Sequence, residues 1–224
     1  MQSITKDNSM DLTLYGFKKT RSVRPQWLLE ELGLNYQFIE VNIFKGEGFS
    51  KKYRAIHPHG QLPALKINEQ VIFESGAICH WLADQFPQSS CNTQAKEKQT
   101  FAPAYNDPLR AEYEQWMFYI SATLEPPVWH YMLHTRILPK EKRIEAVANW
   151  NKGQYLKLLK TLNHLLKGKQ YLLGQDFSAA DIMLAYLLFW FPEFLIQFPV
   201  LKNYSDHLEK REAYQNLHFS KSLL

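Results

Sequence analysis

The order of strand and helix patterns in the first third of the chain constrains its fold more than any other feature. Strand segments are rich in aromatic and β-branched residues, and helix segments begin with proline or serine or end with glycine. In chain order they are LTLYG (12–16), PQWLLEELG (25–33), YQFIEVNI (36–43), ALKI (64–67), VIF (71–73) and SGAICHWLADQF (75–86). The order βαβ followed by ββα predicts a small mixed sheet with helices on its faces and a right-handed first crossover.

This α/β arrangement is thioredoxin-like, and the rest of the chain has a different pattern. A polar stretch at 86–94 contains proline and lacks periodicity, and the segments after it have helical spacing. The helical segments are 109–125, 142–168 and the apolar run after Phe177. We expect a polar tail (1–10), a thioredoxin-like domain (11–88), a linker (89–94) and an all-α C-terminal domain (95–224).

The apolar run from Ile182 to Phe198 is the strongest candidate for a buried helix. It contains Pro192, so we expect a core helix that stops at that proline. Just before it, FSAADIML has the form of a capping box, with Ser178 as N-cap and Asp181 reaching back to it. We interpret this motif as structural.

Composition excludes some classes of partner and favours others. With 26 basic and 22 acidic residues, the net charge of +4 is too mild to indicate nucleic acid binding. No window approaches the length of a membrane span, and the first ten residues lack the apolar stretch of a signal peptide. Cys79 and Cys91 form no CxxC pair, which suits a reducing cytoplasm. We therefore expect a cytoplasmic protein without membrane or nucleic acid partners.

Two motifs in the first domain suggest a ligand site. In IHPHGQLPAL, Pro63 stands where the hairpin begins, and a cis bond there would leave the preceding backbone groups unpaired and open to a peptide. In FESGAI, Ser75 is the predicted N-cap of a helix whose positive end suits a carboxylate, while the Glu74 carboxylate suits an ammonium group. Ser75 and Glu74 would thus hold an amino-acid zwitterion. A simple turn proline would also explain the first motif, and a simple helix cap with a solvated Glu74 would explain the second.

Other motifs give weaker signals. His130 and His134 are four residues apart and could share a metal, but no third ligand is evident and we expect no metal. The GEG triplet (46–48) does not extend to a nucleotide-binding loop. The basic loop YGFKKTRSVRP (15–25) joins the first strand to the first helix, so it should face the crevice where α/β sheets bind ligands.

The combination of motifs resembles the cytosolic glutathione S-transferase superfamily over almost the whole chain after residue 10. The resemblance rests on TRSVRPQWLLEELGLNYQ, HPHGQLPAL and FESGAI in the first half and on LEPP, FSAADIMLAY and REAYQNL in the second. It implies a thioredoxin-like domain that binds glutathione as co-substrate, a helical domain that supplies much of the pocket for a small hydrophobic electrophile, and a homodimer. The implied activity is attack of the glutathione thiolate on that electrophile, by conjugation or reduction, as in detoxification.

By position in the resemblance, Leu62 pairs with the cysteinyl part of glutathione before a cis Pro63, and Glu74 with Ser75 holds the γ-glutamyl end. Gln61 is placed beside the glycyl end. The thiol of glutathione needs an activating hydroxyl, because an ordinary thiol is mostly protonated at neutral pH. Thr20 precedes the Arg-Ser pair where related bacterial enzymes carry this hydroxyl, so it ranks first, and the alternatives in order are Tyr15 and then Ser22 or no activator.

Two departures from the family pattern bear on activity. Many serine-type relatives place basic residues before the short helix that precedes HPHG, whereas this chain has GEGFS (46–50). Lys51 or Lys52 could substitute for the contact with the glycyl carboxylate. Threonine also replaces the more usual serine. The first departure, together with the basic loop at 15–25, leaves an alternative function open: a non-catalytic relative that binds a protein partner as a stress or transcription factor.

Overall fold

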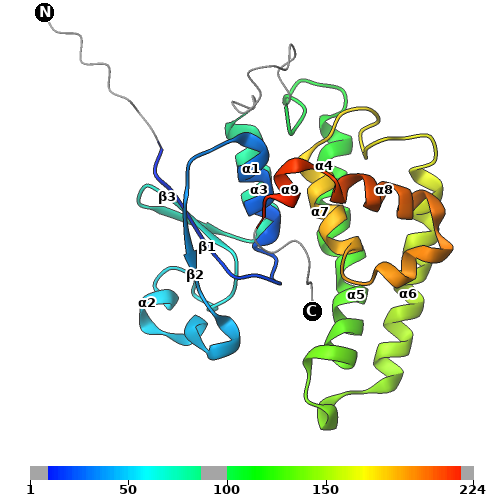
Figure 1. Cartoon of the computed structure of the whole chain (residues 1–224), viewed down its shortest axis with the longest axis horizontal. Helices are drawn as coiled ribbons and strands as arrows, with labels where there is room; N and C mark the ends of the chain where they lie inside the picture. Colours follow the sequence, from blue (N-terminus) through cyan, green and yellow to red (C-terminus); the bar gives the residue numbers. More distant parts are fainter. Residues whose placement is uncertain (1–9, 87–99, 218–224) are drawn as a thin grey trace, which may run out of the picture.

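The first half of the protein is a four-stranded sheet flanked by helices (Figure 1). The computed structural model describes residues 10–86 and 100–217 of the 224-residue chain, so the predicted linker at 89–94 and most of the predicted polar tail lie outside the described residues. The elements of the first half are β1 (Leu12–Gly16), α1 (Val23–Leu32), β2 (Gln37–Glu40), η1 (Ile43–Lys45), η2 (Glu47–Phe49), α2 (Lys51–Arg54), β3 (Ala64–Ile67), β4 (Gln70–Phe73) and α3 (Ser75–Gln85).

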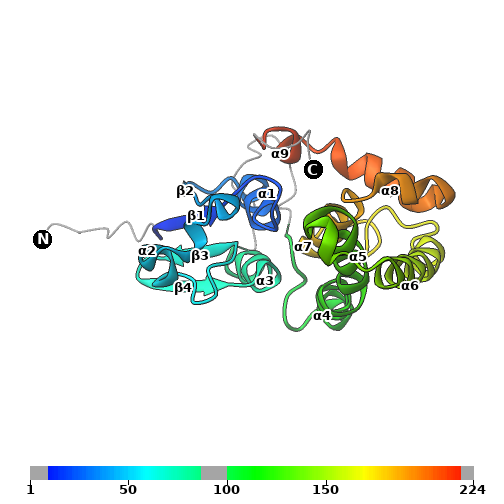
Figure 2. The ribbon, with the colours of Figure 1, turned by 90° about the horizontal axis from the view of Figure 1, so that it is seen from below.

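The sheet has the strand order β2-β1-β3-β4, with β1 and β2 parallel and the other pairs antiparallel. Alternate residues of β1 are buried, and Leu14 belongs to the same core as Trp27 of α1 and Ile78 of α3. Helices α1 and α3 lie between the sheet and the helical half, while α2 lies away from that half (Figures 1 and 2). The predicted thioredoxin-like fold is confirmed.

The second half is helical, and its centre is a helix buried along its whole length. The elements are α4 (Arg110–Tyr119), the π-helical η3 (Ile120–Leu124), α5 (Glu125–Met132), the π-helical η4 (Leu133–Ile137), η5 (Lys140–Lys142), α6 (Glu145–Leu165), α7 (Ala179–Leu188), η6 (Pro192–Gln197), α8 (Pro199–Glu209) and α9 (Glu212–Gln215). Every residue of α7 is buried, and α7 contacts both α1 and α3. The two halves therefore share one continuous core.

The capping box predicted before α7 is present and is part of a larger buried network. The Ser178 amide donates to Asp181 Oδ2 at 2.8 Å and the Ser178 hydroxyl donates to the same oxygen at 2.7 Å. Asp181 Oδ1 accepts from the Leu172 amide at 2.8 Å and from the Tyr204 hydroxyl at 2.6 Å. Asp181 is fully buried, and its hydrogen bonds connect α7 with α8 and with the loop before α7.

Three predicted element boundaries were wrong. The strand predicted to end at 43 ends at Glu40, because Asn42 caps the turn that follows by accepting from the Lys45 amide at 3.1 Å. Helix α1 begins two residues before Pro25. Proline is tolerated in this first turn, because amides there have no hydrogen-bond partner within the helix. The long apolar helix already ends at Leu188, and Pro192 begins a separate 3-10 helix.

Candidate functional site

The loop between β1 and α1 carries the hydroxyl ranked first as the activator. The Thr20 hydroxyl donates to the Phe17 carbonyl at 2.7 Å, lies 2.7 Å from the Ser22 hydroxyl and accepts from the Ser22 amide at 3.3 Å. Thr20 is half-buried, whereas Ser22 is buried. The loop thus fixes the position of the Thr20 oxygen and leaves Thr20 more accessible than Ser22.

Tyr15, the second-ranked activator, lies in a different environment. It alternates with the buried Leu14 along β1, and its ring centroid is 5.9 Å from that of Tyr53 in α2. The Tyr53 hydroxyl donates to the Gln61 carbonyl at 2.6 Å. Tyr15 is therefore packed on the α2 side of the sheet, together with the segment that leads to Pro63.

The peptide bond between Leu62 and Pro63 is cis, as the resemblance implied. Leu62 is half-buried, and its amide and carbonyl have no hydrogen-bond partner in the part of the chain that the structure describes. Strand β3 starts two residues later, at Ala64, which pairs with Tyr15. The result is an unpaired backbone edge at the end of the sheet where the Thr20 loop also lies, and such an edge can pair with an extended peptide.

The GEG triplet has a structural explanation that sequence reasoning missed. Gly60 has a φ of +64°, and a Cβ at Gly48 would stand 2.3 Å from the Gly60 carbonyl oxygen. The two backbones pack too closely for any side chain at Gly48. Glycine there holds the segment before α2 against the HPHG turn, while Lys51 and Lys52 on α2 are exposed.

The start of α3 differs from the prediction in one respect. Glu74, with a φ of +73°, is the N-cap, and Ser75 is the first helical residue instead of the predicted N-cap. The Ser75 hydroxyl is buried and accepts a hydrogen bond from Arg24 Nη1 at 3.1 Å, so it does not cap the helix. The Glu74 carboxylate is exposed and makes no hydrogen bond or ion pair within residues 10–86 and 100–217. A ligand ammonium group would therefore find an uncommitted carboxylate.

A buried charge cluster behind this site was not predicted. Glu125, the first residue of α5, binds Arg24 Nη2 through Oε2 at 2.7 Å and Arg21 Nε through Oε1. Arg21 also lies over the rings of Trp129 and Trp190, with its guanidinium carbon 4.5 and 5.3 Å from their centroids. Burial would raise the pKa of Glu125, but the two guanidinium groups outweigh burial and hold its pKa below the ordinary value. The cluster carries a net positive charge beside the Thr20 loop.

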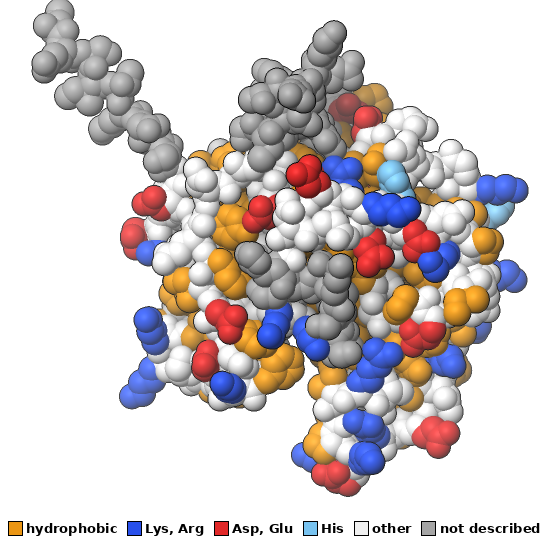
Figure 3. Space-filling model, viewed as in Figure 1, with side chains coloured by type: hydrophobic (Ala, Val, Ile, Leu, Met, Phe, Trp, Pro, Cys, Tyr) orange, Lys and Arg blue, Asp and Glu red, His pale blue; other side chains and the backbone are white. Residues whose placement is uncertain are grey.

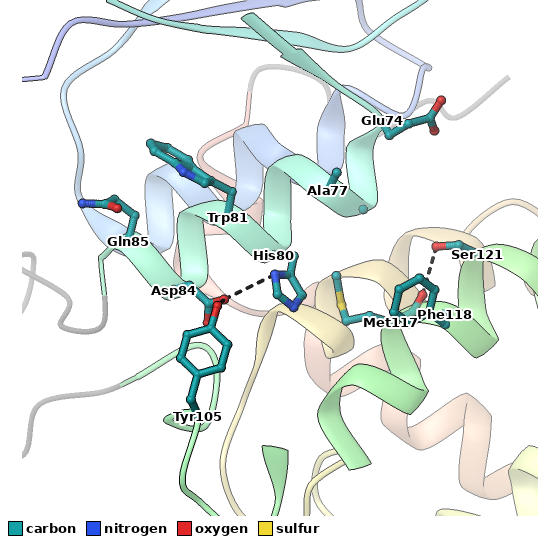
Figure 4. A pocket seen from close by; sticks show the side chains of 11 residues that line it. Glu74, Ala77, His80, Trp81, Asp84, Gln85, Tyr105, Met117, Phe118 and Ser121 are labelled. Atoms are coloured by element: carbon teal, nitrogen blue, oxygen red, sulfur yellow. Dashed lines mark hydrogen bonds and ion pairs between the residues drawn. The ribbon is translucent and has the colours of Figure 1, made fainter. Parts of the chain in front are cut away.

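A cavity lies next to this site, between α3 and α4. It has a volume of about 700 Å³, and Figure 4 shows Glu74 at one end and Tyr105 at the other. At the Tyr105 end, Asp84 accepts from the Tyr105 hydroxyl at 2.9 Å and pairs with Arg110 at 2.6 Å. Apolar and aromatic side chains, Phe118 among them, also line the cavity.

The histidine pair is not assembled into a metal site. His134 Nδ1 accepts from the Ile144 amide at 3.1 Å, so that nitrogen is committed to the backbone. Among the described residues, no group of three or more potential ligands comes together. In the same part of the chain, no helix has the length and apolar character needed to cross a membrane.

Family models match both halves of the chain. The model described as "Glutathione S-transferase, N-terminal domain" matches residues 10–84, and "Glutathione S-transferase, C-terminal domain" matches residues 126–218. A zeta class glutathione S-transferase of Euphorbia esula is 37% identical over 89 residues, which span 39% of this chain and 40% of that protein. Glutathione S-transferase F10 of Arabidopsis thaliana is 28% identical over 175 residues, 77% of each protein.

A solved structure agrees with these relatives. The theta class glutathione S-transferase from the citrus canker pathogen Xanthomonas axonopodis pv. citri, with glutathione bound, superposes with a TM-score of 0.78 at 26% identity. The alignment covers 96% of this chain and all of that chain. A thioredoxin-like domain followed by a helical domain defines the class. The chain belongs to the cytosolic glutathione S-transferase superfamily, and these relatives are enzymes by name.

Proposed function

We propose that this protein is a glutathione transferase that directs the glutathione thiolate at small hydrophobic electrophiles, by conjugation or by glutathione-dependent reduction. The observation that carries the proposal is the unpaired Leu62 backbone beside cis Pro63 in the same domain as the uncommitted Glu74 carboxylate. A γ-glutamyl peptide has the matching groups, since it combines a peptide backbone with an amino-acid zwitterion. Leu62 would pair with the cysteinyl unit, Glu74 and Ser75 would hold the γ-glutamyl end, and Gln61 would lie beside the glycyl end.

The chemistry requires a thiolate. A free thiol has a pKa of about 8.5, so most of it is protonated at neutral pH. The Thr20 hydroxyl and the net positive charge of Arg21, Arg24 and Glu125 would favour the charged form. The thiol proton leaves to solvent, and the sulfur electron pair forms a bond to the electrophilic atom. An aryl halide then loses its halide, whereas the nitrogen of an isothiocyanate takes up the displaced electron pair and a proton. A hydroperoxide is cleaved to an alcohol and the sulfenic acid of glutathione, which a second glutathione converts to the disulfide and water. No metal is needed for this step.

The notch in the molecular surface supports a second-substrate site between the two halves. Figure 3 shows the outline indented between the lobe that carries α2 and the lower ends of α5 and α6. Arg21, next to Thr20 in sequence, lies over the ring of Trp129, which is partly exposed and would give such a site an aromatic wall. Lys and Arg side chains lie among Asp and Glu on this face, so it is not a continuous basic surface of the kind that binds nucleic acid phosphates.

Turnover of a panel of electrophiles tests the proposal. The purified protein should turn over at least one aryl halide, isothiocyanate or hydroperoxide when glutathione is present. Folded protein that neither binds glutathione nor turns over any of these compounds would exclude it. The cytoplasm, where glutathione keeps thiols reduced, is the proposed location, and the free buried Cys79 is compatible with it.

Replacing Glu74 with glutamine should weaken glutathione binding about 10- to 100-fold, because a hydrogen bond to a charged group contributes roughly 1.5–3 kcal/mol. Titration calorimetry with glutathione measures the dissociation constant. The matched control is Glu69→Gln, since Glu69 is an exposed glutamate in the turn between β3 and β4 that pairs with Lys66 at 3.4 Å. Equal dissociation constants for the Glu74 and Glu69 variants would exclude Glu74 from the site.

We also propose that the protein is a homodimer that associates through the α3–α4 face. Phe118 is 70% exposed and borders the cavity between these helices, and an exposed aromatic beside an apolar hollow suits burial against a partner. Phe118→Glu should convert the dimer to a 26.4 kDa monomer in sedimentation analysis. The control Trp150→Glu, at an equally exposed aromatic residue on α6, should remain dimeric. A wild-type monomer would contradict this proposal.

A further inference from the structure

Arg24 is a buried residue of α1 behind the proposed glutathione site. Its side chain is 2% exposed. Nη1 donates to the Ser75 hydroxyl at 3.1 Å, and Nη2 donates to Glu125 Oε2 at 2.7 Å. Nε has no hydrogen-bond partner among residues 10–86 and 100–217. One guanidinium group therefore connects the start of α3 with the first residue of α5.

The contact with Arg24 determines what the Ser75 hydroxyl can do. A guanidinium group has only donors, so the Ser75 oxygen must act as the acceptor. The hydroxyl proton is then directed to another partner, and its donor strength increases because the oxygen already accepts from a cation. Ser75 is the first residue of α3, where the amides of the first turn have no partner within the helix. The hydroxyl proton and these amides are together suited to a carboxylate.

Glu125 fixes the guanidinium group in this orientation. Its carboxylate accepts from Arg24 through one oxygen and from Arg21 through the other. Because the guanidinium group is planar, binding Nη2 to Glu125 also sets the direction of Nη1 toward Ser75. A lysine at this position has one terminal nitrogen and would have to reach both partners with it. The helical half of the chain thereby influences a residue of the thioredoxin-like half.

We infer that Arg24 is a positioning residue that orients the Ser75 hydroxyl toward the α-carboxylate of a γ-glutamyl ligand, with Glu125 of the helical domain holding Arg24 in place. The inference rests on the proposed function, because it assigns the γ-glutamyl end to Glu74 and Ser75. A purely structural role for Arg24 as a link between the domains would make its effect independent of the Ser75 hydroxyl. Binding measurements can therefore separate the two roles.

The test is a double-mutant cycle with glutathione as the titrant. Arg24→Lys should raise the dissociation constant of glutathione about tenfold, as should Ser75→Ala. The double variant should bind about as weakly as Ser75→Ala alone, because the lysine substitution acts through a hydroxyl that is no longer present. The rate at saturating glutathione should change less than the dissociation constant. The inference would be overturned if the increase in the dissociation constant of the double variant equalled the product of the two single increases. It would also be overturned if Arg24→Lys bound glutathione within twofold of the wild type.

Two further variants serve as a control and as a replacement in this test. Arg211→Lys is the matched control, since Arg211, the N-cap residue of α9, makes a comparable ion pair with Glu31 of α1 at 2.5 Å, and it should leave glutathione binding unchanged. If Arg24→Lys does not fold, Glu125→Gln takes its place. That variant should weaken binding severalfold when Ser75 is present and have no effect in the Ser75→Ala background, and equal effects in both backgrounds would overturn the inference. If the wild-type protein bound no glutathione, the proposed function itself would be wrong, and not only the role of Arg24.

Discussion

Thr20→Ala is expected to lower turnover about 100-fold at saturating glutathione while changing the dissociation constant of glutathione less than threefold. A single donor that stabilises developing or full negative charge in an active site contributes roughly 10²–10³ in rate. The Thr20 hydroxyl oxygen accepts a hydrogen bond from the Ser22 amide, and the hydroxyl donates its own hydrogen bond to the Phe17 carbonyl. Rotation about one bond would turn this proton toward a thiolate. Steady-state kinetics with calorimetry of glutathione binding separates the two effects.

Two companion variants make the Thr20 result specific. Thr20→Ser keeps the hydroxyl and should retain most of the turnover. Tyr15→Phe should have little effect, because Tyr15 packs against Tyr53 and no hydrogen bond joins it to the Thr20 loop in the described residues. Loss of activity in Tyr15→Phe with unchanged activity in Thr20→Ala would reverse the assignment of the activator.

Asp181→Ala is expected to reduce the free energy of unfolding by about 3–5 kcal/mol. The carboxylate accepts from two amides and two hydroxyls in a fully buried position, and each buried donor left without a partner costs roughly 1–3 kcal/mol. The expected loss is smaller than the sum over the four donors, because the surrounding side chains relax and water enters the site. Urea unfolding followed by circular dichroism measures this loss.

The matched control for this stability prediction is Asp206→Ala on α8. Asp206 pairs with Lys202 at 2.6 Å, but both side chains are more than 40% exposed. An exposed pair of this kind contributes roughly 0–1 kcal/mol. If Asp181→Ala cost no more than Asp206→Ala, the buried network would not stabilise the fold in the way described.

Local patterns were sufficient for the fold and for part of the site. Glycine at 33 ends α1 with a φ of +64°, as its position in the sequence indicated, and the capping box at Ser178 begins α7. The cis bond before Pro63 was also foreseen, although only the family resemblance assigned the cysteinyl contact to Leu62. In each case the signal and its consequence lie within a few residues of each other.

Features that depend on distant residues were not predictable. Arg24 and Glu125 are separated by about 100 residues, and neither periodicity nor spacing indicates that they meet. Serine is a favoured N-cap, so its assignment at Ser75 followed local preference. Pairing with Arg24 instead placed the serine inside the helix, and Glu74 took the cap with a positive φ. Tertiary contact overrode local preference there.

Ultraviolet titration of the glutathione thiolate in the saturated complex tests the central proposal most directly. The absorbance of the thiolate is followed against pH for free glutathione and for glutathione bound to the protein. If the site around Leu62, Glu74 and Ser75 binds glutathione and the Thr20 loop activates it, the midpoint of the bound thiol should lie at least about one pH unit below the ordinary thiol value of about 8.5. A bound midpoint equal to that of free glutathione, or no saturable binding, would contradict the account.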